Sequence, residues 1–295
     1  MLFILSISFF IIRFFTNLYT FEFQASLFIP VVISFLSLMM FHQLGTITFK
    51  SRDSGLIAAF LFLISPWQHA LVMRSTIGVL FVFLLIVTLY FFLKKQRKIL
   101  LTGGVVLTGM CLAVLLFQQQ TIAEIIHEQD KVIWQQIVSD NSTQSVLITR
   151  ALHNKVFETN WFTLERLLTY FEPQGFFITG SYFIGKSLVG SGFLLTASFP
   201  FFIYGLLLMI RKTIHPFLLL FLLFGATPGI VSIHVQHIIL GSALLIPLLL
   251  ITTYGISEWI KNSLFKTVLV FFVLTLNFVF VYAQYMPILM IQSAP

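Results

Sequence analysis

The sequence predicts an all-α, multi-pass transmembrane helical bundle of about eight or nine spans with a helical extracytoplasmic loop. Three observations predict this class. Of the 295 residues, 58% are hydrophobic and only 9% are charged, whereas a soluble domain carries about a quarter charged residues. Long apolar runs approach the roughly 20 residues that a helix needs to cross a bilayer. Basic residues gather in the short turns between those runs, as they do in membrane proteins.

The apolar runs follow one another in a regular order. The first, residues 2–15, is interrupted by Arg13; it has no basic leader and no cleavage site after it, so we expect an anchor rather than a removable signal peptide. The third run stops at Pro66, which cannot supply a backbone donor inside a helix. After the first run, the runs are residues 26–44, 55–65 (the third), 77–93 and 99–117 before the main polar segment. After that segment they are residues 188–210, 216–230, 238–256 and 268–282.

The chain divides into three parts: N-terminal transmembrane helices (1–117), an extracytoplasmic loop (118–187) and C-terminal transmembrane helices (188–295). Apolar residues recur at helical spacing within the loop, which predicts helices that lie on the membrane or on the bundle. The two periodic sets are Ile122, Ile125, Ile126, Ile133 and Ile137, then Trp161, Leu164, Leu168 and Phe171. Pro173 and Gly175 end the second set.

Basic residues predict which side of the membrane each turn occupies. The cluster in residues 94–98 is the clearest cytoplasmic marker. Alternation of the runs then places ten basic residues inside: Lys50, Arg52, Lys94, Lys95, Arg97, Lys98, Arg211, Lys212, Lys261 and Lys266. We therefore expect a multi-pass protein of the cell membrane, most simply a bacterial inner membrane, with residues 118–187 outside. This distribution explains the net charge of +7, so we expect no nucleic-acid partner.

Polar residues near the ends of the runs are the candidates for a site. Arg74 follows Trp67 and His69 at an outward-facing end. Its side chain either snorkels to the headgroups or, with Trp67 and His69, binds an anionic lipid headgroup through its two parallel donors. Pro66 would open the helix there and free backbone groups to line a cavity.

A histidine pair and one glutamate are further site candidates, and each has two possible roles. His234 and His237 lie three residues apart. Such a pair can ligate a metal, but it needs another ligand, and no nearby acid or cysteine is present; we favour a cavity end that hydrogen-bonds a phosphate or hydroxyl, and predict no metal site. Glu22 either pairs with Arg13 at the interface or acts as a base. The single cysteine, Cys111, excludes an intramolecular disulfide.

Several stretches resemble the bacterial membrane glycosyltransferases of the GT-C superfamily, which are kin to the dolichyl-phosphate-mannose protein mannosyltransferases and the aminoarabinose transferase. The resemblance covers about residues 25 to 260. The matching residues, in order, are Ser65, Pro66, Trp67, Gln68 and His69 through Arg74; His153, Asn154 and Lys155; Tyr170, Phe171, Phe176 and Phe177; Phe199, Pro200 and Phe201; and Thr227, Pro228 and Gly229 through His234.

The chain also departs from that pattern. The family carries an acidic pair in a long first external loop, whereas Glu22 is the only acid in the short turn here, so the catalytic loop is expected to be missing. His237 stands where the family has an arginine, and Gly180 and Ser181 stand where it has a glycine and an aspartate. The expected protein is therefore a family relative that is either truncated or inactive, or has moved its base.

The resemblance implies an activity. A sugar would pass from a polyprenyl-phosphate donor to an extracytoplasmic glycan, lipid or protein, with inversion at the anomeric carbon. Glu22 would be the base, and Trp67, His69, Arg74, Lys155, His234 and His237 would bind the phosphate or substrate. No cofactor is certain, and a divalent cation stays open. The alternatives are a non-enzymatic membrane protein, such as a transporter or lipid-handling subunit, and an O-antigen polymerase or ligase.

Overall fold

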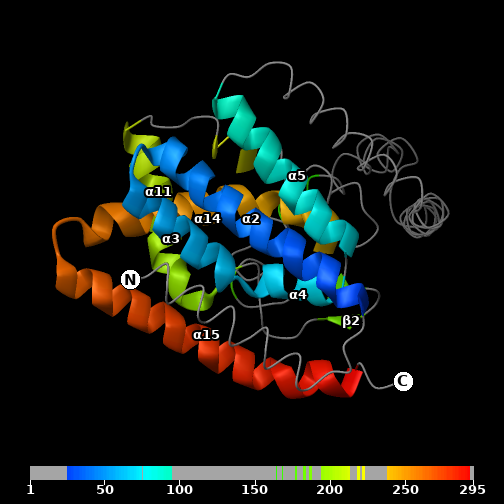
Figure 1. Ribbon diagram of the computed structural model, residues 1–295. Helices are drawn as coiled ribbons and strands as arrows, with labels where there is room; N and C mark the ends of the chain where they lie inside the picture. The colour runs from blue at the N-terminus through cyan, green and yellow to red at the C-terminus, as the bar shows by residue number, and fades with distance from the viewer. Residues whose placement is uncertain are drawn as a thin grey trace, which may run out of the picture.

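A computed structural model of the protein describes residues 25–74, 76–94, 164, 168, 177, 182–183, 186–187, 194–212, 218–219, 221–222 and 238–292. The elements are α2 (Ala25–Phe49), α3 (Arg52–Leu63), α4 (Pro66–Arg74), α5 (Thr76–Leu93), the 3₁₀ helix η1 (Thr196–Ser198), α11 (Phe199–Lys212), α14 (Ile238–Ile260) and α15 (Leu264–Gln292). Strands β1 (Tyr182–Phe183) and β2 (Lys186–Ser187) form one short antiparallel pair. The predominantly helical fold class is confirmed for this part of the chain (Figure 1).

Three helices in the described residues are long and apolar enough to cross a membrane: Phe28–Phe49, Ala243–Ile260 and Leu264–Ala283. A shorter apolar helix covers Ile77–Leu93. These four helices correspond to predicted runs 26–44, 238–256, 268–282 and 77–93. The membrane-like character expected from composition is thus present in the described helices.

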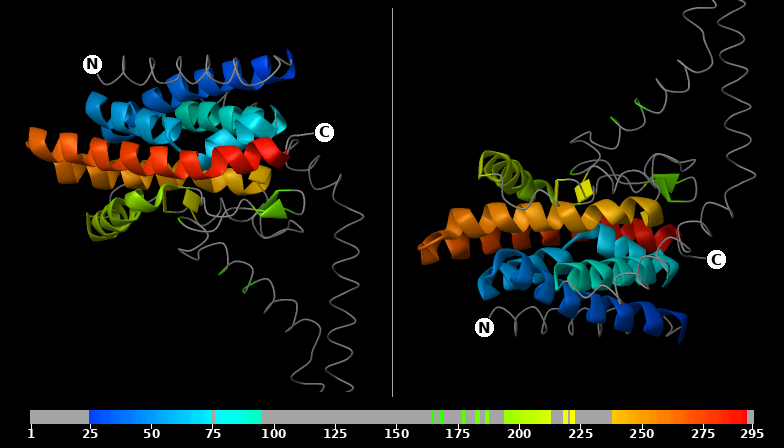
Figure 2. Two further views of the ribbon diagram at one scale, coloured as in Figure 1. Left: turned by 90° about the horizontal axis from the view of Figure 1, so that it is seen from below. Right: turned by 90° about the horizontal axis from the view of Figure 1, so that it is seen from above.

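Helix α14 is the centre of the bundle. It contacts α11, α3, α5, α15 and α4, and Figures 1 and 2 show it between the helices before residue 95 and α11. Every side chain described from residue 243 to 256 is buried. The hydroxyls of Thr252 and Thr253 donate to the carbonyls of Leu248 and Leu249 one turn earlier, so these polar groups are satisfied within the helix.

Helix α15, in contrast, packs through one face only. Val270, Leu274 and Phe278 are buried at a spacing of four residues, which keeps them on one side of a helix. The opposite face exposes Phe272, Leu276 and Phe280, each about 60% accessible. Figure 1 shows α15 along one side of the bundle. An apolar face of this kind suits contact with lipid chains.

Four glycines bring helix backbones into direct contact. A Cβ on Gly205 would collide with the carbonyl oxygen of Ile251, and one on Gly255 would collide with that of Phe201, where α11 crosses α14. At the α2–α3 contact, a Cβ on Gly45 would lie 2.8 Å from the Cβ of Ala58, and one on Gly55 would overlap Thr46. Small residues permit such close approach in membranes, where dispersion contacts drive helix association.

Tight turns join helices at one end of the bundle. Lys50 ends α2 with φ 52°, and Ser51 then caps α3 by accepting a hydrogen bond from the Ser54 amide. Asn262, with φ 64°, lies in the turn between α14 and α15. We call this the basic end; its cations are Lys50, Arg52, Arg211, Lys212, Lys261 and Lys266, all of them exposed.

The predicted run 188–210 differs from the structure. Residues 186–187 belong to β2, a 3₁₀ turn occupies Thr196–Ser198, and the α-helix begins only at Phe199. Its start is fixed locally, because the Ser198 hydroxyl donates to the Leu195 carbonyl and Pro200 suits the first turn of a helix. Helix α11 has 14 residues and extends about 21 Å, which is shorter than a hydrocarbon core of about 30 Å.

Candidate functional site

The described helices contain one break that the sequence predicted. Helix α3 ends at Leu63, and α4 begins at Pro66. Proline is favoured at the first helical position, since the amide that it lacks would have no intrahelical partner there. The Ser65 carbonyl accepts the His69 amide at 3.3 Å and so begins the ladder of α4. The stop predicted at Pro66 is therefore confirmed.

The break lies deep in the bundle. Ser65 is 13 positions from Arg52 at the basic end, which corresponds to about 20 Å along a helix. If Arg52 lay at the surface of a hydrocarbon core of about 30 Å, this level would be inside the apolar layer. Non-helical backbone is tolerated there only where protein encloses it or where it lines a water-filled cavity. Ser65 is 1% exposed, so protein encloses this break.

The residues after the break link α4 to two other helices. The Gln68 amide nitrogen donates to Ser34 Oγ on α2 at 3.1 Å, and both residues are buried. The His69 ring lies 5.4 Å from the ring of Phe278 and 6.4 Å from that of Tyr282, both on α15. Trp67 is buried. Helix α4 is therefore held on α2 by a hydrogen bond and on α15 by ring contacts.

A second set of polar contacts lies at a similar level. Asn277 is 13 positions into α15, about 20 Å from its start, and its Oδ1 accepts the Ala197 amide at 3.2 Å. The Thr196 hydroxyl donates to the Phe177 carbonyl at 2.8 Å, and the Phe177 ring packs edge-on against Phe199 at 4.9 Å. These bonds attach the start of α11 to α15.

We call this level of the bundle the break layer. Its described polar side chains are Ser34, Ser37, Ser65, Gln68, His69, Thr196, Ser198 and Asn277. None of them is an acid, and His69 is the one among them that is ionisable, so this layer offers mainly hydrogen bonds. Within the residues that the structure describes, no group of three or more His, Cys, Asp or Glu side chains could hold a metal.

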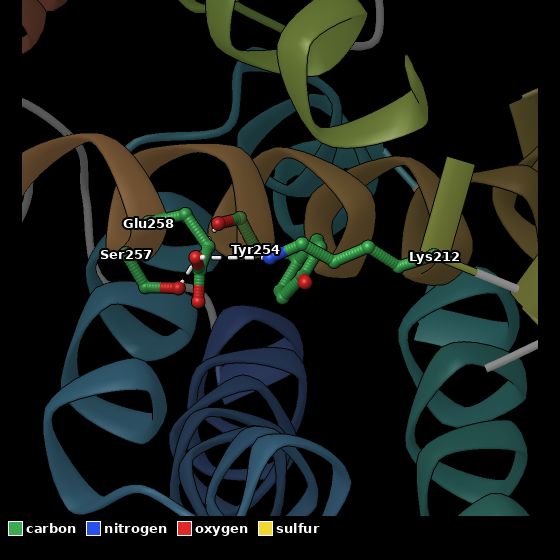
Figure 3. A network of polar contacts seen from close by, with 4 residues as sticks. All are labelled: Lys212, Tyr254, Ser257 and Glu258. Atoms are coloured by element: carbon green, nitrogen blue, oxygen red, sulfur yellow. Dashed lines mark hydrogen bonds and ion pairs between the residues drawn. The ribbon is translucent and has the colours of Figure 1, made fainter. Parts of the chain in front are cut away.

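The basic end has different chemistry (Figure 3). Lys212 Nζ lies 3.5 Å from Glu258 Oε2, with side-chain exposures of 45% and 28%. The pKa of Lys212 is raised above its ordinary value, chiefly by the charge of Tyr254 and next by that of Glu258. Lys266 lies over the Trp259 ring at 5.3 Å. Exposed pairs of this kind contribute little to stability, so these charged contacts add little to the cohesion of the basic end.

The structure describes three of the predicted site residues. Trp67 and His69 lie in α4, directly after the break, and Trp67 is buried. Arg74 is the last residue of α4. Glu22, Lys155, His234 and His237 lie outside the described residues.

Sequence reasoning did not single out Ser34 or Asn277, and it took Gln68 only as part of the stretch before Arg74. A polar residue in an apolar run is the signal that could have found all three, because such residues in membrane segments usually face the protein interior. No protein-family model, curated protein or solved structure matches this chain.

Proposed function

We propose that this chain is a membrane glycosyltransferase-like protein that takes a sugar from a polyprenyl-phosphate donor and transfers it to an acceptor outside the cell. The break between α3 and α4 carries this proposal. It falls at Ser65–Pro66, within the stretch that resembles the GT-C enzymes, and it is followed by Trp67, which is buried, and His69, whose ring packs on α15. Interrupted helices that are enclosed by protein commonly form ligand sites in membrane proteins.

The proposed topology has about eight or nine spans, with the basic end in the cytoplasm and residues 118–187 outside. Two observations support it. The turns at Lys50 and Lys261 lie at the same end of the bundle, as the positive-inside tendency requires. Arg74 is 22 positions from Arg52, about 33 Å along helices, which is enough to bring it to the opposite interface.

The residues have assigned roles in this proposal. Arg74 contacts the donor phosphate through its guanidinium, because two parallel donors match the phosphate oxygens. Lys155, His234 and His237 add donors for the phosphate and the sugar, and Trp67 and His69 form the buried wall beside them. Glu22 is the candidate base, a contribution of about 10²- to 10⁴-fold. The cations stabilise the departing phosphate.

The test is release of polyprenyl phosphate from a polyprenyl-phosphate sugar labelled in the sugar, with the protein in proteoliposomes. We expect Arg74→Ala to reduce release about tenfold or more, and Glu22→Gln to reduce it about 100-fold or more while the donor still binds. Lys261→Gln is the control, since Lys261 is an exposed cation at the other end. Equal release by the native protein and Arg74→Ala would contradict the proposal.

A second candidate is a non-enzymatic membrane protein that handles a lipid, either as a transporter or as a subunit. The observation that favours it is that the described polar side chains of the break layer include no carboxylate that could serve as a base. An O-antigen polymerase or ligase would share the external loop. Binding of the donor without sugar release would select the non-enzymatic candidate.

A further inference from the structure

The Gln68 amide is the least satisfied polar group of the break layer. Gln68 is 2% exposed. Its Nε2 donates to Ser34 Oγ at 3.1 Å, while its Oε1 has no hydrogen-bond partner among the described residues. A buried amide oxygen loses its bonds to water on folding, so leaving it unpaired destabilises the protein.

Reversing the amide does not remove this deficit. If the oxygen and nitrogen exchange places, the oxygen accepts from the Ser34 hydroxyl and the nitrogen becomes the atom without a partner. Ser34 offers one hydroxyl, and the amide presents two different polar ends. One end is therefore left over in either orientation.

The backbone beside Gln68 can accommodate a change at this position. Gln68 lies three residues after Ser65, where the helical hydrogen bonds of α3 have ended and those of α4 begin. A segment of nine residues attached through such a break can tilt without opening the helix before it. Helix α4 is therefore the element that can admit a molecule next to α2.

We propose that the Gln68 amide binds an uncharged hydroxyl group of a lipid or glycolipid that enters the bundle between α2 and α4. A hydroxyl both donates and accepts, so it satisfies whichever end of the amide Ser34 leaves over. A phosphate only accepts and brings a negative charge, and burial of an unpaired charge is strongly unfavourable. His69 is the one ionisable side chain among those described in the break layer, and its ring packs against Phe278 and Tyr282 on α15, whereas Gln68 faces Ser34 on α2. This site is separate from the phosphate contact assigned to Arg74, and it holds whether or not the protein transfers sugar.

The proposal predicts two opposite effects of one substitution. Gln68→Leu removes the unpaired amide, so the ligand-free protein should melt at a higher temperature. The same change removes the binding group, so the affinity for a hydroxyl-bearing lipid should fall by about tenfold or more. A purely structural amide would instead lower the melting temperature when it is removed. Gln68→Met provides the same test should the leucine variant fail to fold.

The experiment measures the melting temperature of the purified chain in a dimethylamine-oxide detergent, whose headgroup carries no hydroxyl. Three probes are added in turn: monoglucosyl dioleoylglycerol, dioleoylglycerol and dioleoylphosphatidylcholine. We expect the first or second to raise the melting temperature and the third, which has no hydroxyl, to leave it unchanged. A shift with the glucosyl lipid alone identifies a sugar hydroxyl, a shift with dioleoylglycerol alone identifies the glycerol hydroxyl, and equal shifts show that the amide binds either hydroxyl.

Two further variants complete the test. Gln43→Leu replaces an exposed glutamine of α2 and should keep the full shift. Ser34→Ala removes the one partner of the amide, so it should lower the ligand-free melting temperature and still allow the hydroxyl probe to stabilise the protein. The proposal is overturned if no hydroxyl probe shifts the native chain, which would leave water as the occupant. It is also overturned if Gln68→Leu retains the shift or melts at a lower temperature.

Discussion

The basic end and the break layer of the described bundle are built in different ways. Near the basic end, α11 crosses α14 with backbone against backbone at Gly205 and Gly255, and the charged groups are exposed. About 20 Å away, the chain breaks between α3 and α4, and the contacts are made by neutral groups such as the buried Gln68 and the half-buried Asn277. The basic end is fixed by shape, whereas the break layer depends on a few hydrogen bonds.

This difference teaches where function can reside. Backbone contacts between glycines leave no space for a ligand and tolerate almost no change, as is usual for close-packed interiors. A layer held by single hydrogen bonds can exchange them for bonds to a ligand at little net change in free energy. The break layer is therefore the part of the described bundle that can both hold its shape and bind.

The largest expected effect is at the glycine contact of α11 with α14. Gly255→Val places carbon atoms where the Phe201 carbonyl lies, and backbone cannot move aside as a side chain can. We expect a loss of about 3 kcal/mol or more in the free energy of unfolding, measured in mixed micelles. Leu207→Ala, on the exposed side of α11, is the control and should change stability by less than about 0.5 kcal/mol. Similar stability of both variants would show that the helices do not cross there.

A smaller loss is expected at the break layer. Asn277→Leu removes the oxygen that accepts a hydrogen bond from the Ala197 amide. The amide then loses this hydrogen bond. The expected cost is about 1–3 kcal/mol, with faster hydrogen exchange at Ala197. Leu276→Ala, the exposed neighbour, should leave that exchange rate unchanged. Unaltered protection of the Ala197 amide in Asn277→Leu would contradict the contact.

The turns of the basic end should respond in the opposite direction. Lys50 has φ 52°, a conformation that is unfavourable by about 1–2 kcal/mol for a residue with a Cβ. Lys50→Gly should therefore stabilise the protein by up to about 1 kcal/mol, visible as a higher melting temperature. Lys94→Gly at the end of α5 is the comparison and should bring no gain, since only Lys50 and Asn262 among the described non-glycine residues have positive φ. A lower melting temperature for Lys50→Gly would show that this turn is not left-handed.

The smallest effect is expected at the ion pair. Glu258→Gln removes the carboxylate that pairs with Lys212, but the pair is partly exposed, so stability should fall only slightly. The raised pKa of Lys212 means that any contribution is present below the ordinary value of 10.5 and is lost as pH rises through the higher folded value. The difference between the native chain and Glu258→Gln should thus be constant from about pH 6 to 8. A change across that range would contradict the assignment.

Much of the fold could be predicted from the apolar runs and from one proline, without any use of hydrophobic periodicity. Runs 26–44, 77–93, 238–256 and 268–282 became helices because an apolar stretch in lipid has few options other than a helix. Pro66 ended α3 as expected, since proline lacks the amide that would continue it. The start of α11 was missed, although Ser198 and Pro200 are local signals for it, because the mainly apolar run was taken as one span. The Asn277–Ala197 bond at the turn before α11 involves a distant helix and has no local signal.

The candidate site was less accessible to sequence reasoning. The sequence placed Trp67 and His69 beside the break, but it did not indicate that Trp67 is buried. The pairing of Gln68 with Ser34 spans 34 positions, and no local pattern indicates which of several polar residues in apolar runs will meet. Hydrophobic spacing locates helices, whereas such pairings are decided when the helices pack.

The most direct test of the account is the sidedness of the two ends. Cys111 is replaced by serine, and single cysteines are introduced by Arg74→Cys and, separately, Lys261→Cys. Intact cells are then treated with a membrane-impermeant maleimide, and labelling is compared before and after permeabilisation. The account predicts that Arg74→Cys is labelled in intact cells and Lys261→Cys only after permeabilisation. Labelling of both positions from the same side would contradict it.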